Sequence, residues 1–270
     1  MKKIKIFLLL LIMLSLTSCG VVNREYNNSI NNKVIHVEDY TIDEFQDAIV
    51  IATEKAEQSC ISIVDTGYVG TSLGSAVIIK RVCYNGTEIV DSVEKATKFE
   101  YFAITNRHVV EGVNRKVSAY LKENVTDDKY VTSNVEILHK SEIEDLALIK
   151  FSSHIQLEPC TINRSLNLKK GQIVLAVGSP HSLEYYNTVT MGIISHPNRI
   201  IAEDNKKVNY VQHDAALNPG NSGGGLFDIN GQLIGINTAR IEDKDDYIFG
   251  ISLAIPINDI IQEIGEEYFE

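Results

Sequence analysis

Between residues 60 and 254 the chain consists of short runs rich in Val, Ile and Tyr, separated by Gly, Asn and Asp. Runs of this length and composition predict β-strands that reverse direction at tight turns. They cover residues 60–65, 74–82, 99–105, 116–121, 134–139, 146–151, 172–178, 187–195, 207–213, 224–228, 232–238 and 248–254. Many short strands at this spacing predict an all-β protein of the barrel or sandwich type.

The series of strands is interrupted between residues 152 and 170, where the sequence is typical of a connecting segment. The strands therefore fall into two sets of about six, the first at about 59–151 and the second at about 171–256. Together with flanking helices, they make up a folded body that we place at residues 41–270.

A short helix is expected at each end of this body. Thr41 and Glu44 have the spacing of a capping box, in which each residue satisfies a free backbone N–H of the first helical turn, and this predicts a helix over 41–58. Asn258 is expected to cap a last helix over about 258–268.

The N-terminus has the pattern of a secretory signal. Three lysines among the first five residues precede eleven residues of which Ser15 alone is polar, a stretch too short to span a bilayer comfortably. Residues 1–18 are therefore expected to be a signal peptide. The string Leu16-Thr17-Ser18-Cys19 resembles the lipobox of bacterial lipoproteins, which implies diacylation of Cys19; the alternative is an ordinary signal peptide followed by an incidental cysteine. The Asn-rich residues 19–40 suit a flexible tether.

The charge balance excludes some partners. The chain carries 25 Lys and Arg against 36 Asp and Glu, a net charge of −11, and removal of residues 1–18 takes away three lysines and no acid, which leaves −14. Nucleic acid is not expected as a partner, because no basic stripe is available to neutralise phosphates. Adhesion to anionic lipid is not expected either. The signal peptide and the lipobox together predict a protein of the bacterial cell envelope, outside the cytoplasm, that is held on the membrane through lipid on Cys19.

Three cysteines follow the predicted signal peptide: Cys60, Cys83 and Cys160. Cys60 and Cys83 flank a Gly-rich turn and could form a disulfide across a hairpin, or all three could be small buried thiols, which we favour. No CxxC or HExxH pattern occurs, and we expect no metal site and no cofactor.

The most informative short sequence is Gly220-Asn221-Ser222-Gly223-Gly224. A serine between glycines allows a sharp turn that exposes Oγ and leaves neighbouring N–H groups free to bind an oxyanion. The string also fits the nucleophile turn of α/β-hydrolases. That fold needs a catalytic His after the Ser, yet the last histidine of this chain is His213.

The opposite order, with His and Asp before Ser, is available. His108 lies in Thr105-Asn106-Arg107-His108-Val109-Val110 and Asp145 begins Asp145-Leu146-Ala147-Leu148-Ile149-Lys150. Together with Asn218–Gly224, these strings resemble the signatures of the HtrA (Deg) family of trypsin-like serine proteases. The resemblance covers about residues 41–265. It implies two six-stranded antiparallel β-barrels of the chymotrypsin type, and a serine-type endopeptidase.

The resemblance also implies a role for each residue. Ser222 attacks the scissile carbonyl, His108 takes and returns the proton, and Asp145 orients the imidazole and stabilises its charged form. The N–H groups of Gly220 and Ser222 form the oxyanion hole.

The substrate-binding residues follow in the same way. Thr238 aligns with the hydroxyl residue that hydrogen-bonds the catalytic Asp, and Ala239 and Arg240 fall where substrate backbone pairs as an added strand. Ala216 and Leu217 stand where tryptic enzymes have the floor of the specificity pocket, so an apolar pocket that prefers Val, Ala or Leu is expected.

The expected function is cleavage of unfolded or damaged envelope proteins through an acyl-enzyme. The alternative is a non-catalytic, chaperone-like or pseudoprotease lipoprotein that binds such chains. A homotrimer is possible, as in relatives, and no PDZ domain is expected after the last helix. Three departures from the family pattern stand out: Gly225 replaces a Pro, His213 stands where a Thr is usual, and residues 83–99 form a longer insertion.

Overall fold

The computed structural model describes residues 41–67, 70–112, 116–122, 129–164, 167–203, 206–242 and 247–269, and the strands at 26–28 and 33–35. The chain divides into two compact units, residues 1–47 and residues 48–270. The predicted signal peptide and Cys19 lie outside the described residues.

In the first unit, β1 (Tyr26–Asn28) pairs antiparallel with β2 (Lys33–Ile35). Helix α2 (Ile42–Glu57) starts in this unit. The predicted capping box is confirmed: Glu44 Oε2 accepts the Thr41 N–H at 2.7 Å, and Thr41 Oγ1 accepts the Glu44 N–H at 3.2 Å. Such reciprocal bonds satisfy donors that have no partner within the helix.

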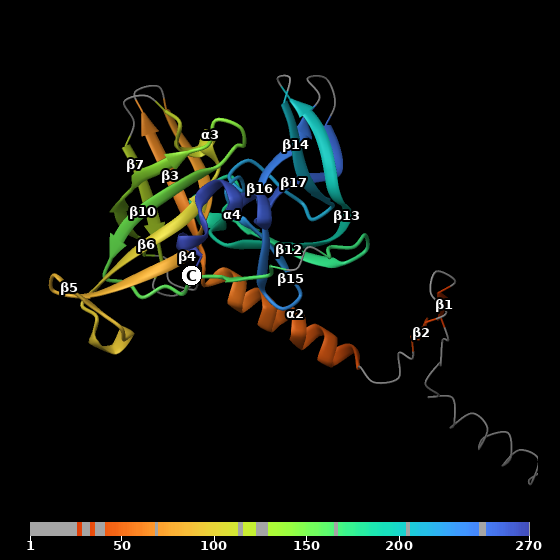
Figure 1. The fold of residues 1–270 in the computed structure, drawn as a ribbon, viewed down its shortest axis with the longest axis horizontal. Helices are drawn as coiled ribbons and strands as arrows, with labels where there is room; N and C mark the ends of the chain where they lie inside the picture. Colours follow the sequence, from red (N-terminus) through yellow and green to blue (C-terminus); the bar gives the residue numbers. More distant parts are fainter. Residues whose placement is uncertain are drawn as a thin grey trace, which may run out of the picture. The chain divides into compact units, whose positions relative to one another are not determined.

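The second unit begins with an antiparallel sheet in which strands distant in the chain, such as β3 and β7 or β6 and β10, are neighbours (Figure 1). Its strands are β3 (Cys60–Gly67), β4 (Gly70–Asn85), β5 (Glu88–Val90), β6 (Lys98–Thr105), β7 (Lys116–Leu121), β8 (Val131–Asn134), β9 (Glu136–Lys140) and β10 (Ala147–Ser153). The hydrogen-bonded order is β8-β7-β3-β4-β6-β10-β9, with β5 paired to β4. The short helices η1 (Val93–Lys95) and α3 (Arg107–Val110) precede and follow β6.

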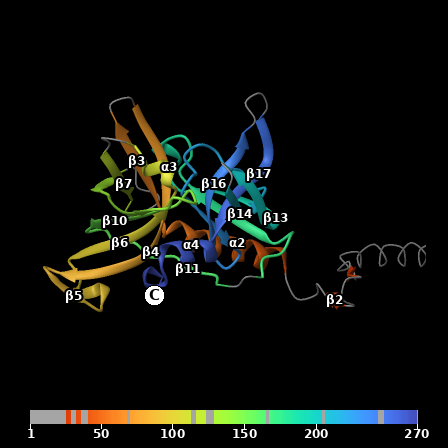
Figure 2. The same cartoon turned by 45° about the horizontal axis from the view of Figure 1, so that its top comes forward.

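A second sheet forms a closed barrel (Figure 2). Its strands are β11 (Thr161–Ile162), β12 (Ile173–Gly178), β13 (Thr188–Glu203), β14 (Lys206–His213), β15 (Gly225–Asp228), β16 (Gln232–Glu242) and β17 (Tyr247–Pro256), with η2 (Leu183–Tyr185) between β12 and β13. The order β16-β15-β12-β13-β14-β17 closes into a ring because β17 also pairs with β16. After it come α4 (Ile257–Ile264) and η3 (Glu266–Tyr268).

Alternating burial explains why these segments are strands. Along β6, Phe99, Tyr101 and Ala103 are buried while the residues between them are half-buried, as expected for a strand with one face on the core. Each sheet encloses its own apolar cluster, and a third cluster joins the two sheets to α2 and α4. Each fully buried Leu or Ile in these clusters contributes about 1.5–3 kcal/mol.

The predicted all-β, two-barrel class is confirmed, with differences in detail. The first sheet is a half-barrel, since no ladder of the described residues joins β8 to β9, although Ser133 Oγ of β8 donates to Ser152 O of β10 at 2.6 Å. The prediction that Asn258 caps the last helix was wrong. Helix α4 starts at Ile257 after Pro256, whose fixed φ fits the entry to a helix.

The favoured prediction is confirmed for Cys60 and Cys83, which are buried free thiols; Cys160 is also a free thiol but is only half-buried. The insertion at 83–99 holds β5 and η1, which extend the edge of the first sheet. None of the helices in the described residues is long and apolar enough to cross a membrane.

Candidate active site

The ends of two paired strands bring His108 and Asp145 together. Strands β6 and β10 are antiparallel with Thr105 opposite Ala147, so the residues after β6 and before β10 lie at the same edge of the sheet. Here His108 sits in the one-turn helix α3, with its Nδ1 2.6 Å from Asp145 Oδ2. The His108 backbone N–H donates to Asp145 Oδ1 at 3.0 Å. The carboxylate therefore fixes both the ring and the backbone of the histidine.

The Asp145 carboxylate also receives a bond from the second barrel. Thr238 Oγ1 of β16 donates to Asp145 Oδ2 at 2.7 Å. Burial by itself would raise the pKa of Asp145, but the bonds from His108 and Thr238 outweigh it and hold that pKa below its ordinary value. Asp145 is thus an anion at neutral pH, and its side chain is 28% exposed.

Ser222 lies in the turn between β14 and β15, held by the glycines that the sequence analysis emphasised. Gly223 has φ +84°, and a Cβ there would lie 2.1 Å from Ser75 O, so no other residue fits without displacement. Ser222 Oγ donates to the carbonyl of Thr238 at 3.1 Å. Hydrogen bonds therefore connect His108, Asp145, Thr238 and Ser222 in one continuous series.

The loop before Ser222 has two free backbone donors. The N–H groups of Asn221 and Gly223 donate to Asn218 O and Asn237 O, whereas among the described residues the N–H groups of Gly220 and Ser222 have no acceptor. Two unobstructed donors one residue apart, next to a serine hydroxyl, can bind an oxygen that carries developing negative charge.

Two residues that the sequence analysis assigned no role hold this loop in place. Ser75 Oγ of β4 donates to Gly220 O at 2.8 Å and accepts the Ser179 N–H at 2.9 Å. The His181 N–H donates to Pro219 O at 2.7 Å. Because N–H and C=O of a trans peptide point in opposite directions, this bond turns the Gly220 N–H away from residue 181.

The sequence offers some signal for Ser75 and none for His181. Ser75 belongs to the string Gly74–Ile79, whose resemblance to the family was part of the sequence match, so its type and place could have suggested a structural role. His181 has φ +66°, an uncommon conformation for a residue other than Gly, and no local pattern indicates it.

The residues predicted to line the specificity pocket lie on the segment before the loop. Ala216 is exposed and Leu217 is half-buried, and the Ala216 carbonyl accepts Thr190 Oγ1 at 2.9 Å. Asp214 Oδ1 accepts the Ile193 N–H at 2.6 Å, so this acid is engaged by the barrel backbone.

The predicted strand-addition edge lies on β16. Ala239 and Arg240 of this strand pair with Leu253 and Ser252 of β17, and a bulge falls between Asn237 and Ala239. Bulges re-aim backbone groups next to active sites in many sheets. The side chains of residues 239–240 lie outside the described part of the structure.

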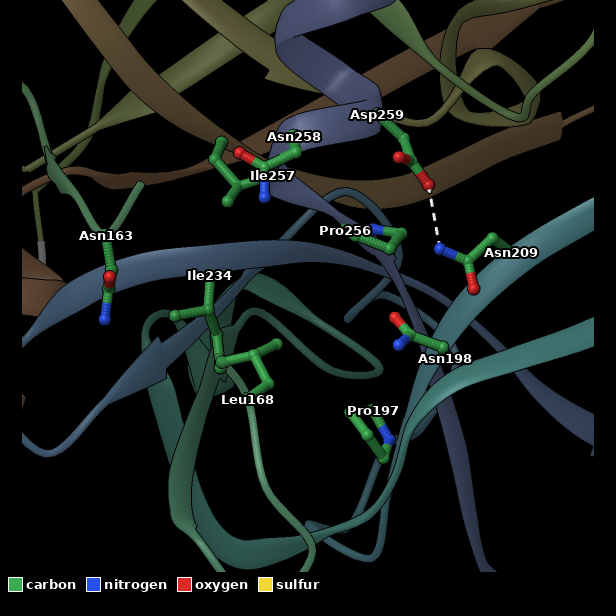
Figure 3. A pocket seen from close by; sticks show the side chains of 10 residues that line it. All are labelled: Asn163, Leu168, Pro197, Asn198, Asn209, Ile234, Pro256, Ile257, Asn258 and Asp259. Carbon is green, nitrogen blue, oxygen red and sulfur yellow. Dashed lines mark hydrogen bonds between the residues drawn. The ribbon is translucent and has the colours of Figure 1, made fainter. Parts of the chain in front are cut away.

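A separate pocket of about 60 Å³ opens beside the start of α4 (Figure 3). Asn163, Asn198, Asn209 and Asp259 supply polar groups around it, and Asn209 Nδ2 donates to Asp259 Oδ2 at 3.1 Å. It contains none of the predicted site residues. Among the described residues, no group of three or more His, Cys, Asp and Glu could hold a metal ion.

Comparison with known proteins gives a consistent result. Residues 91–236 match the family described as trypsin-like peptidase domain. The chain is 35% identical over 170 residues to serine protease Do-like HtrA of Bacillus subtilis, which covers 62% of this chain and 36% of that protein. It is 31% identical over 245 residues to serine protease Do-like HtrA of Lactococcus lactis, which covers 88% of this chain and 54% of that protein.

A solved structure of the HtrA-type protease AlgW with tripeptide matches at a TM-score of 0.64 and 29% identity, over 82% of this chain and 64% of that chain. The chain therefore spans between 36% and 54% of the length of the two curated relatives.

Proposed function

Because this chain belongs to the HtrA group of trypsin-like peptidases, we propose that it is a serine endopeptidase with His108, Asp145 and Ser222 as its catalytic triad. The observation that carries the proposal is the Asp145 carboxylate, which binds His108 of α3 and Thr238 of β16, while the Thr238 carbonyl accepts from Ser222 Oγ. Hydrogen bonds through Asp145 and Thr238 thus link the proposed base to the proposed nucleophile.

The proposed chemistry starts at the imidazole. With Nδ1 held by Asp145, the tautomer that carries its proton on Nδ1 leaves Nε2 free as a base. Nε2 removes the Ser222 proton as Oγ forms a bond to the substrate carbonyl carbon, and then protonates the leaving amine as the C–N bond breaks. Water enters by the same steps in reverse and releases the acyl group from Ser222. The ionised Asp145 stabilises the imidazolium in both halves.

The oxyanion of each tetrahedral intermediate is proposed to bind the N–H groups of Gly220 and Ser222. Loss of one such donor typically costs about 2.7–4 kcal/mol of transition-state stabilisation. Ser222 Oγ donates to Thr238 O, so this hydrogen bond must be exchanged for one to His108 before the proton can be transferred. Catalytic hydrogen bonds often tighten in this way when substrate binds.

The proposed substrates are unfolded or damaged polypeptides of the bacterial envelope. A substrate that pairs with β16 at Ala239 and Arg240 must expose its backbone, and an apolar side chain between Ala216 and Leu217 must be accessible. Folded proteins bury both features. Location outside the cytoplasm, anchoring through lipid on Cys19 and assembly as a homotrimer belong to the same proposal and rest on the sequence and on the relatives.

One observation favours a second candidate. The bond from Ser222 Oγ to Thr238 O turns the hydroxyl to a carbonyl instead of the imidazole, as in a non-catalytic binding protein whose nucleophile is not activated. Such a protein would bind unfolded chains and release them intact.

A cleavage assay separates the two candidates. The full-length chain, purified in detergent, is incubated with unfolded casein beside Ser222→Ala and Ser133→Ala; the latter removes a comparable hydroxyl bond far from the site. We expect cleavage by the wild type and Ser133→Ala and none by Ser222→Ala. Equal cleavage by all three would refute the triad, and suppression of casein aggregation without cleavage would favour the binding protein. Labelling of Ser222 by a fluorophosphonate, abolished in His108→Ala, is the independent check.

A further inference from the structure

The segment at residues 179–186 lies beside the loop that carries the Gly220 and Ser222 N–H groups, here called the oxyanion loop. It lies on the side opposite β16, the strand expected to bind substrate. In the second barrel β15 lies between β16 and β12, and residues 179–186 continue from β12. At Gly220 a Cβ would lie 2.4 Å from Ser179 O and 2.9 Å from the His181 nitrogen. On the other side, Gly223 N–H donates to Asn237 O, at the β16 side of the same loop. The loop is therefore flanked by β16 and by residues 179–186.

This arrangement fixes where the two halves of a substrate go. If the acyl half pairs with β16 and its carbonyl binds the donors of the loop, the chain that continues beyond the scissile bond leaves β16 behind. Ser179 O and the His181 nitrogen are close neighbours of Gly220 on the side away from β16, so the leaving-group half of the substrate is expected to lie against residues 179–186.

Two exposed rings occupy this surface. His181 is exposed, Tyr185 is 53% exposed, and their ring centroids lie 6.3 Å apart with the planes inclined by 53°. Two adjacent rings with open faces favour contact with a large apolar or aromatic side chain, through area removed from water and through ring stacking.

The backbone does not require an imidazole at residue 181. With φ +66° a glycine would adopt the observed conformation without strain, and the bond to Pro219 O uses the backbone N–H, which glycine also has. Replacement of His181 by Gly therefore removes the imidazole and keeps the backbone conformation and its hydrogen bond.

The surface is held rigid by contacts with the first sheet and with α2. Tyr130 Oη donates to Leu183 O, and Tyr186 Oη donates to Cys60 O at 3.2 Å. The Asn187 side chain donates to Glu57 O at 2.9 Å. Binding groups on a fixed backbone lose little freedom when a ligand binds, so a modest contact area can still discriminate among side chains.

We propose that His181 and Tyr185 form a subsite that takes a large apolar or aromatic side chain at the first or second position after the scissile bond. The inference rests on the proposed peptidase function and adds a selectivity on the leaving-group side.

The test uses internally quenched peptides that share one acyl half and differ at the two positions after the bond, with Phe, Leu, Gly or Asp there. We expect wild-type kcat/KM to be about tenfold higher for Phe or Leu than for Gly. In His181→Gly, which keeps the backbone donor and the left-handed conformation, and in Tyr185→Ala, the ratio of Phe to Gly should fall to about twofold. Ile89→Ala, a change of an exposed side chain on β5, is the matched control and should keep the wild-type ratio.

Each other outcome overturns something specific. Cleavage with no preference, a preference for Asp, or a Phe to Gly ratio that survives in both His181→Gly and Tyr185→Ala refutes the subsite and leaves the peptidase function intact. Failure of the wild type to cut any peptide or unfolded casein refutes the peptidase function, and the subsite with it.

Discussion

Replacement of Ser75 by Ala tests the link between the two sheets behind the active site. Its hydroxyl donates to Gly220 O and accepts the Ser179 N–H, at 2.8 and 2.9 Å, and Ser75 is fully buried. Each bond contributes about 0.5–1.5 kcal/mol, and a buried group left without a partner costs about 1–3 kcal/mol. We therefore expect the free energy of unfolding to fall by about 3 kcal/mol. For a unit of this size, Tm should fall by about 6–12 °C.

The same substitution should impair catalysis, because the Gly220 carbonyl loses its hydrogen bond and the loop that carries the proposed oxyanion donors is held less firmly. A loss equal to that of one oxyanion donor, about 2.7–4 kcal/mol, is the upper limit. We expect kcat to fall at least tenfold with little change in KM. Thermal unfolding followed by circular dichroism and peptide kinetics at 25 °C measure both effects, with Ser133→Ala as the control. The reasoning is refuted if Ser75→Ala melts no lower than Ser133→Ala, or if it keeps full kcat.

Three further predictions concern catalysis and pH. Thr238→Ala removes a bond to a charged carboxylate, worth about 1.5–3 kcal/mol, so kcat should fall by roughly ten- to a hundredfold while Thr238→Ser stays active in the same peptide assay. Burial lowers the pKa of His213 to about 4, so the folded state loses stability relative to the unfolded state as pH falls from 6.5 to 4. His213→Thr restores the residue usual in the family. Its free energy of unfolding, measured with urea, should fall by about 3 kcal/mol less than that of the wild type between pH 6.5 and pH 4, and an equal fall contradicts the assignment. Burial and the nearby Asp259 raise the pKa of Glu144 to about 7, so the free energy of unfolding falls as pH rises from 4.5 to 7. The urea midpoint of Glu144→Gln should therefore exceed that of the wild type at pH 8 but not at pH 4.5.

The elements of this fold could be predicted because their signals are local. Period-two burial marks strands such as β6, and the reciprocal side chains of Thr41 and Glu44 mark the start of α2, each within a few residues. Asn258 is a residue type that favours the position before a helix, but it lies inside the first turn of α4, because the helix already begins at Ile257 after Pro256. Local preference gives the type of element more reliably than its end.

In the candidate site, too, some features could be predicted from local sequence and others could not. Sequence by itself was enough to select His108, Asp145 and Ser222 as the proposed triad, because the chemistry of a proton relay restricts residue types and because three motifs in one order are specific. Tertiary structure alone decided that Ser75 and His181 hold the loop before Ser222, and that Ser222 Oγ faces the Thr238 carbonyl. These contacts join residues from 16 to 145 positions apart, and they depend on how strands and loops close against each other. A short stretch of sequence does not specify such a partner.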